Sequence, residues 1–158
     1  MNVPAYVGVD PGKATGLVLF VPQTNEFTNS CHDPLDACEQ VRAWLIAYPG
    51  AVLAVERYVI GGGSRRVRSG QTDALHVIGV MRWFAHVYVR DPSRFMLEGA
   101  SDTARVGSRG NLVRLGWVIS CPEGHCHRAA AQVALALART APRSLAAMFA
   151  GGSMNSPT

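Results

Sequence analysis

Two acidic residues each follow directly on an apolar run. Asp10 ends the run 5–9 and Glu56 ends the run 51–55. The carboxyl ends of parallel strands meet at one edge of a sheet, where ligands collect, so we expect the two carboxylates to be neighbours. Such a pair is costly without a cation, because the charges repel and lose hydration. Mg²⁺ or Mn²⁺ would stabilise the pair and activate water for phosphodiester cleavage.

A simpler interpretation of the first acidic residue is a β-turn. In Asp10-Pro11-Gly12 the three residue types suit the first three positions of a tight turn between strands. A nucleotide-binding loop is less favoured, because Gly8 and Gly12 are separated by three residues instead of four and Lys13 is followed by Ala14. On these residues alone, a plain turn and a ligand site remain open.

The elements that would position the acidic residues alternate along the chain. Residues 6–9, 16–20 and 26–30 predict a meander of three strands, and Asp33 with Pro34 predicts the start of a helix that ends before Pro49. Further strands are predicted at 51–55 and 95–98, and helices at 72–87, 111–116 and 126–140. The pattern favours an α/β fold, a mixed five-stranded sheet flanked by helices.

Length and composition favour a single folded domain. The chain has 158 residues, of which 48% are hydrophobic and 16% charged, enough apolar content for a core. We expect this domain over residues 1–145 and a disordered C-terminal tail over 146–158. Neither a long apolar span nor a signal-peptide pattern occurs in the sequence, so we expect no membrane partner and a cytoplasmic location.

Positive charge is concentrated in two glycine-containing segments. The net charge is +4, and the arginines include the clusters Arg65, Arg66, Arg68 and Arg105, Arg109, Arg114. The planar guanidinium pairs with phosphate through two hydrogen bonds, so these segments are candidate phosphate contacts. Ordinary solvated loops are the alternative.

The four cysteines do not indicate a disulfide scaffold, because the chain is long for one and shows no secretory signal pattern. Cys121 and Cys126 flank His125 and precede His127, a grouping similar to a zinc knuckle. The four-residue gap between the cysteines and the lack of a matching second pair make a structural zinc site the weaker interpretation.

Taken in order, these motifs resemble RuvC-type Holliday junction resolvases of the RNase H-like superfamily, most closely the compact phage and actinobacterial variety. The matching segments are Val7-Gly8-Val9-Asp10-Pro11-Gly12 with Thr15-Gly16, then Ala54-Val55-Glu56, then Leu112-Val-Arg-Leu115-Gly116-Trp117 and a histidine at the start of an alanine-rich helix. The resemblance covers residues 5–140 approximately. It implies a metal-dependent endonuclease that resolves four-way or other branched DNA in recombination and repair, acting as a homodimer without a small-molecule substrate.

The resemblance implies that Asp10, Glu56 and His125 bind metal, with two Mg²⁺ or Mn²⁺ ions per site. The chain departs from the family where His-x-x-Asp-Ala is expected, because Arg128 stands in place of the aspartate. Arginine is always cationic and cannot bind Mg²⁺. Three interpretations stay open: His127 or Glu123 replaces the missing ligand or base, the remaining residues act alone, or the protein binds junctions without cutting them well.

The resemblance also implies DNA contacts, for which we expect Lys13, Tyr58, Arg65, Arg66, Arg68, Arg105 and Arg109. Tyr58 would stack on an unpaired base, although an ordinary packing role is the favoured alternative. The helix at 72–87 is apolar nearly all round, which predicts either a central helix or the dimer interface. An actin-like kinase, built on a related Asp-Gly hairpin, is excluded because it needs two such domains.

Overall fold

The computed structural model describes residues 4–58, 69–121 and 124–151. Its strands form one mixed sheet in the order β3-β2-β1-β4-β5. The antiparallel meander contains β1 (Tyr6–Asp10), β2 (Thr15–Val21) and β3 (Glu26–His32). Parallel to β1 lies β4 (Val52–Glu56), and parallel to β4 lies β5 (Phe95–Glu98). The predicted α/β class is confirmed, and the sheet is consistent with an RNase H-like arrangement.

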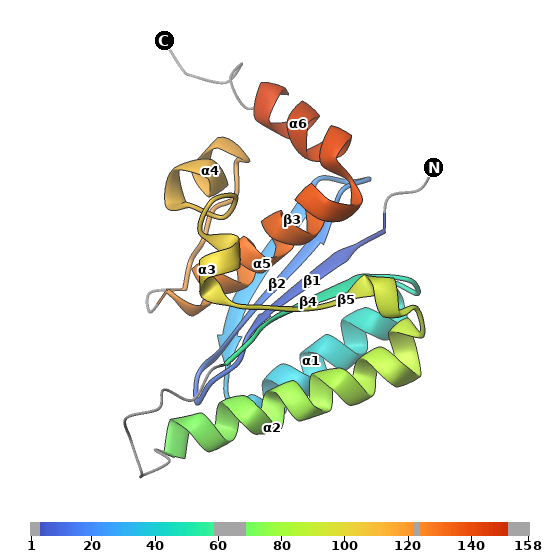
Figure 1. Cartoon of the computed structure of the whole chain (residues 1–158), viewed down its shortest axis with the longest axis vertical. Coiled ribbons are helices and arrows are strands. Elements are labelled where there is room, and N and C mark those ends of the chain that lie inside the picture. The colour runs from blue at the N-terminus through green and yellow to red at the C-terminus, as the bar shows by residue number, and fades with distance from the viewer. Residues whose placement is uncertain (1–3, 59–68, 122–123, 152–158) are drawn as a thin grey trace.

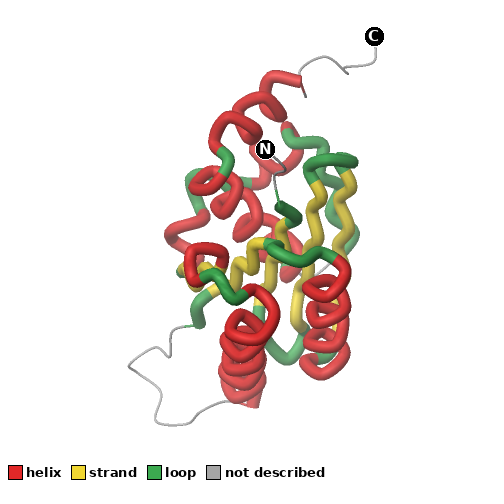
Figure 2. The backbone as a smooth tube through the Cα atoms, turned by 90° about the vertical axis from the view of Figure 1, so that its right-hand side faces the viewer, coloured by secondary structure: helices red, strands yellow, loops and turns green. Residues whose placement is uncertain are grey.

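Helices cover both faces of the sheet (Figure 1). One face carries α1 (Pro34–Ala47) and α2 (Ser69–Phe84), which continues as a π-helical segment, η1 (Ala85–Val89), before the 3₁₀ turn η2 (Pro92–Arg94). The other face carries α5 (His125–Thr140), with α3 (Ala100–Thr103), α4 (Arg109–Arg114) and α6 (Pro142–Gly151) around it. Figure 2 shows α1 and α2 side by side along the sheet.

Alternate residues of β1 face the two helical layers. Val7 and Val9 belong to the apolar cluster on the α1 and α2 side, while Tyr6 belongs to the cluster with α5. Between them Gly8 lets α5 lie directly on the strand, since a Cβ at this position would stand 2.2 Å from the carbonyl oxygen of Ala129. The absent side chain at Gly8 therefore fixes how close α5 comes to the end of β1.

We expect Gly8→Ala to lower the free energy of unfolding by about 3 kcal/mol or more, because the added methyl overlaps main chain that cannot move alone. Gly79→Ala is the matched control: Gly79 lies exposed within α2 with nothing within 4 Å of the added carbon. There alanine favours the helix by about 0.5–1 kcal/mol. Urea unfolding of both variants measures the difference. Equal stability of the two would contradict the close packing of α5 on β1.

The structure corrects the sequence analysis at two places. The helix predicted at 72–87 exposes Leu75 and Trp83, by 41% and 57%, so the central-helix interpretation is wrong and the dimer interface stays a prediction. Residues 146–151, assigned to a disordered tail, continue α6, whose Leu145 is buried against α5.

The predicted helix start at Asp33 is confirmed. The carboxylate accepts hydrogen bonds from the amides of Leu35 and Asp36, and Pro34 occupies the first helical turn. Within the described ranges, no helix is both long enough and apolar enough to span a membrane.

Candidate active site

Three carboxylates stand in a row at the carboxyl edge of the parallel strands. The register pairs Val9 with Val55, which brings Asp10 next to Glu56, and it pairs Glu56 with Glu98. Residues opposite one another on neighbouring strands point to the same face of a sheet, and here that face is covered by α5. The predicted meeting of Asp10 and Glu56 at one edge is therefore present.

Asp10 is 4% exposed and receives two side chains from the first turn of α5. His125 Nδ1 lies 2.7 Å and Arg128 Nε lies 2.9 Å from the same oxygen, Oδ2. His125 and Arg128 are three positions apart, so they share a face of the helix. A Cβ on Gly16 would meet the His125 main chain at 2.3 Å, so glycine at this position allows α5 to begin against β2.

The guanidinium of Arg128 also constrains His125. Arg128 Nη2 lies 2.8 Å from His125 Nδ1 and can only donate a hydrogen bond. Nδ1 therefore either accepts from Arg128 or donates to Asp10 Oδ2, and it cannot do both at once. The hydrogen-bond role of His125 Nδ1 and the position of Arg128 are thus linked.

Glu56 has one buried carboxylate oxygen, Oε2, that stands out at this edge. Its Oε2 has no hydrogen-bond partner among the described residues. Burial raises the pKa of Glu56, and the negative charge of Asp10 raises it further, against the lowering effects of Arg128, Gln132 and His125. Arg128 is bonded to Asp10, so Glu56 is the carboxylate at this edge with the most to gain from an added cation.

Glu98 is the site residue that sequence analysis did not single out. Its carboxylate forms an ion pair with Arg139 of α5, and its carbonyl oxygen accepts a 3.1 Å hydrogen bond from Gln132 Nε2. The available signal was the repeated pattern, because the predicted strand at 95–98 also ends in an acidic residue. Two arginines of α5 thus neutralise the outer two carboxylates of the row.

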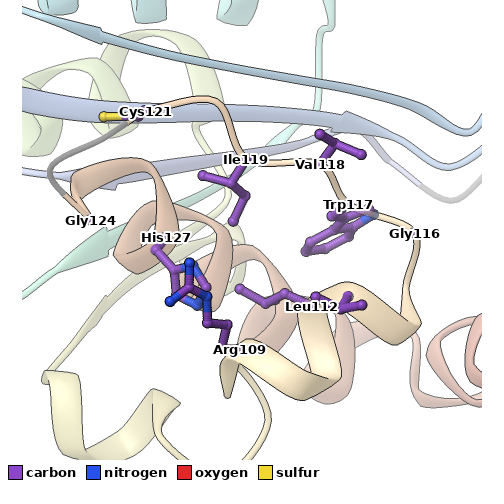
Figure 3. Close-up of a pocket in the computed structure, with 10 residues that line it drawn as sticks. Arg109, Leu112, Gly116, Trp117, Val118, Ile119, Cys121, Gly124 and His127 are labelled. Carbon is purple, nitrogen blue, oxygen red and sulfur yellow. The ribbon is translucent and has the colours of Figure 1, made fainter.

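The structure places His127 beside a cavity next to the first turn of α5. His127 lies two positions after His125, on a different side of α5, and lines this cavity together with Arg109 (Figure 3). Burial lowers the pKa of His127, and the positive charges of Arg109 and Arg128 lower it further. This position gives no support to the replacement of the missing aspartate by His127, which stays a prediction, and the other candidate, Glu123, lies outside the described residues.

The predicted DNA contacts fall at several places. Lys13 is exposed in the turn that follows Asp10, and Arg105 and Arg109 are exposed near α4. Tyr58 is half-buried and packs against the core, which favours the structural interpretation of this residue. The cluster Arg65, Arg66 and Arg68 lies outside the described residues.

The donor set fits one hard cation better than two. Asp10 and Glu56 supply two adjacent carboxylates, and the unpartnered Glu56 Oε2 offers a ligand atom. Mg²⁺ and Mn²⁺ are commonly held by one or two carboxylates and several waters. In the described part of the chain, however, no three His, Cys, Asp or Glu side chains gather in a ligand geometry.

We expect Glu56→Gln to raise the free energy of unfolding at neutral pH without divalent ions. The pKa of Glu56 is raised above its ordinary value of 4.5, so its ionisation costs stability as the pH rises from there through the folded-state pKa. Urea unfolding at about pH 4 should show little difference from wild type, and unfolding at about pH 7 should favour the variant. Glu26→Gln, an exposed change, is the control.

Added Mg²⁺ or Mn²⁺ should make wild type more stable than Glu56→Gln at neutral pH, the reverse of the order expected without divalent ions. A cation that binds only the folded state stabilises wild type, and Glu56→Gln lacks the charge that holds it. Equal stabilisation of both proteins would contradict a cation site at Glu56.

No protein-family model matches this chain, and no curated protein sequence matches it. The fold and the site therefore define it as a mixed α/β protein with a row of strand-end carboxylates opposed by two arginines.

Proposed function

We propose that this protein is a metal-dependent endodeoxyribonuclease that resolves four-way junctions or other branched DNA. The observation that carries the proposal is the pairing of Asp10 with Glu56, whose Oε2 is buried without a partner among the described residues. This arrangement coincides with the motifs that resemble RuvC-type resolvases. It is the arrangement expected of carboxylates that hold a divalent cation beside a phosphodiester.

In this mechanism Asp10 and Glu56 would hold a divalent cation, which would supply Lewis-acid activation of water and charge stabilisation at the leaving oxygen. His125 is oriented through Nδ1 by Asp10 Oδ2, so its other ring nitrogen is the group that positions or deprotonates the attacking water. Exposed arginines and Lys13 would bind the DNA backbone without reading its sequence.

A homodimer would suit the two-fold symmetry of a junction that is cut at two points. Leu75 and Trp83, exposed by 41% and 57% on α2, supply apolar surface for such an interface.

A second candidate is a junction-binding protein that cleaves weakly. The observation that favours it is the contact of Arg128 with Asp10 Oδ2, made by Nε and Nη2, each at 2.9 Å. A guanidinium in this place supplies positive charge to the carboxylate that a metal would otherwise share. DNA binding through the backbone does not need that metal.

The test is cleavage of a synthetic four-way junction by the purified protein over a titration of Mg²⁺ and Mn²⁺. Metal-dependent nicking near the branch point, absent on a linear duplex of the same sequence, supports the nuclease. Tight binding to the junction with no nicking at any metal concentration supports the second candidate. Failure to bind or cut the junction contradicts both.

A further inference from the structure

A second feature of the molecule lies beside the first turn of α5. An open cavity of about 520 Å³ is formed by α4, residues 116–121 and the start of α5 (Figure 3). Its size falls within the range of sites that take small organic ligands, about 300–1,000 Å³. The nuclease mechanism does not use this cavity.

The interior of the cavity is apolar and held in place by aromatic packing. Leu112 and Trp117 are nearly fully buried, and the Trp117 ring stacks on Phe27 at 4.8 Å between centroids. Figure 3 shows the side chains of Leu112 and Ile119 extending into the space between α4 and the segment above it. These groups form a firm wall suited to a planar apolar ring.

The rim of the cavity exposes apolar side chains to solvent. Val113 is 69% and Val118 is 80% exposed, two of the most exposed large apolar residues in the described ranges. Adjacent exposed apolar residues around a concave site are typical of a binding surface. A ligand that covers Val113 and Val118 would remove their apolar surface from water, which is favourable.

The opposite end of the cavity is positively charged. Arg109 and His127 lie next to each other there (Figure 3), and the pKa of His127 is lowered first by burial and then by the charge of Arg109. Among the described lining residues there is no Asp or Glu to balance Arg109. An anionic group on a ligand would supply that balance. The cavity thus combines an apolar wall with a cationic end.

We propose that this cavity binds one nucleotide of the DNA strand, with the base against Leu112, Trp117 and Ile119 and the phosphate on Arg109. A nucleobase has apolar faces and hydrogen-bonding edges, and a phosphate is the anion that arginine pairs with best. The inference rests on the proposed function in taking DNA as the partner.

The test is methyl NMR of the full chain in the absence of divalent ions, so that no cleavage occurs. The probes are thymidine 5′-monophosphate, thymidine, inorganic phosphate and a single-stranded thymidine pentanucleotide. We expect the monophosphate and the pentanucleotide to shift the methyl signals of Val113, Val118 and Ile119. Arg109→Gln should raise the dissociation constants of the monophosphate and of the pentanucleotide by about tenfold, because it removes a charge-assisted hydrogen bond.

Arg143→Gln is the matched control, because Arg143 is an exposed arginine of α6 that does not line the cavity. It should leave the dissociation constants unchanged. Ile119→Trp, which fills the cavity without changing its charge, should weaken the binding of the monophosphate and of the pentanucleotide. The folding of this variant is checked by urea unfolding. Methyl shifts centred elsewhere, or equal affinity in Arg109→Gln and Arg143→Gln, would overturn the proposal.

The same experiment separates this inference from the nuclease. Tighter binding of the pentanucleotide than of the monophosphate supports a DNA strand as the ligand of the cavity. Binding of the monophosphate alone overturns that assignment in favour of a free nucleotide. If the probes shift the methyl signals but the protein cuts no junction, the nuclease proposal is contradicted and the nucleotide cavity is not. If the protein cuts junctions in a metal-dependent way but the probes shift no methyl signals, the nucleotide cavity is contradicted and the nuclease proposal is not.

Discussion

Asp10→Asn is expected to lower Mg²⁺- or Mn²⁺-dependent nicking of a four-way junction by about a thousandfold or more. The amide keeps the shape of the side chain but removes the charge that holds a cation beside Glu56. It also removes the acceptor charge that orients His125 through a 2.7 Å contact. Both losses act on the attacking water, so the effect on cleavage is the largest we expect from a single site.

Junction binding should survive the same change. Backbone contacts depend on arginines and Lys13, not on Asp10, and the loss of one negative charge removes some repulsion from the phosphates. We expect the dissociation constant, measured by fluorescence anisotropy with a labelled junction, to stay within about threefold of wild type. A large loss of binding would show that Asp10 supports the DNA surface and not the chemistry.

The matched control for this experiment is Asp36→Asn. Asp36 is exposed in the first turn of α1, on the face of the sheet opposite α5, and the substitution is chemically identical. Asp36→Asn should cleave like wild type. Equal nicking by Asp10→Asn, Asp36→Asn and wild type would contradict the proposed active site, and it would also reveal a contaminating nuclease.

The sequence predicted the scaffold of this site because its signals are local. The apolar run before Asp10 and the one before Glu56 each define a strand, and the meander defines their neighbours. The strand-end position of both carboxylates follows from these runs alone. Glu98 also ends a strand and completes the row, but its strand has only four residues, so the apolar run before it is a weak signal.

What α5 does at the site could not be predicted, because it depends on distances between elements. Nothing local in the sequence indicates that Arg128 reaches Asp10 Oδ2 or that Arg139 reaches the Glu98 carboxylate. Both contacts follow from the close approach that Gly8 and Gly16 permit. Similarly, the side of α5 on which His127 falls depends on where the helix begins, and a start at His125 turns it toward Arg109.

Arg128→Asp is expected to strengthen the binding of a divalent cation at the acidic edge. The substitution removes the guanidinium from Asp10 Oδ2 and places a carboxylate three residues after His125, where the resembled family has one. Three carboxylates would then face one another without a cation. We therefore expect the variant to lose about 1–3 kcal/mol of unfolding free energy in a chelator and to recover it in Mn²⁺.

Metal affinity and cleavage should rise together in this variant. Isothermal titration with Mn²⁺ should show at least about a tenfold tighter dissociation constant, since one ligand is gained and one competing charge is lost. Half-maximal nicking of the junction should occur at a correspondingly lower Mn²⁺ concentration. The calorimetric measurement does not depend on activity, so it separates metal binding from any effect on DNA.

Arg128→Gln distinguishes the two ways in which Arg128 can weaken the site, because it removes the charge without adding a ligand. If Arg128→Gln improves Mn²⁺ affinity as much as Arg128→Asp, the guanidinium acts as a competing cation. If only Arg128→Asp improves it, the missing carboxylate is the cause, and the natural protein is a junction binder with impaired cleavage. If both variants bind Mn²⁺ like wild type and cut less, Arg128 contributes to catalysis, and the second candidate function is wrong.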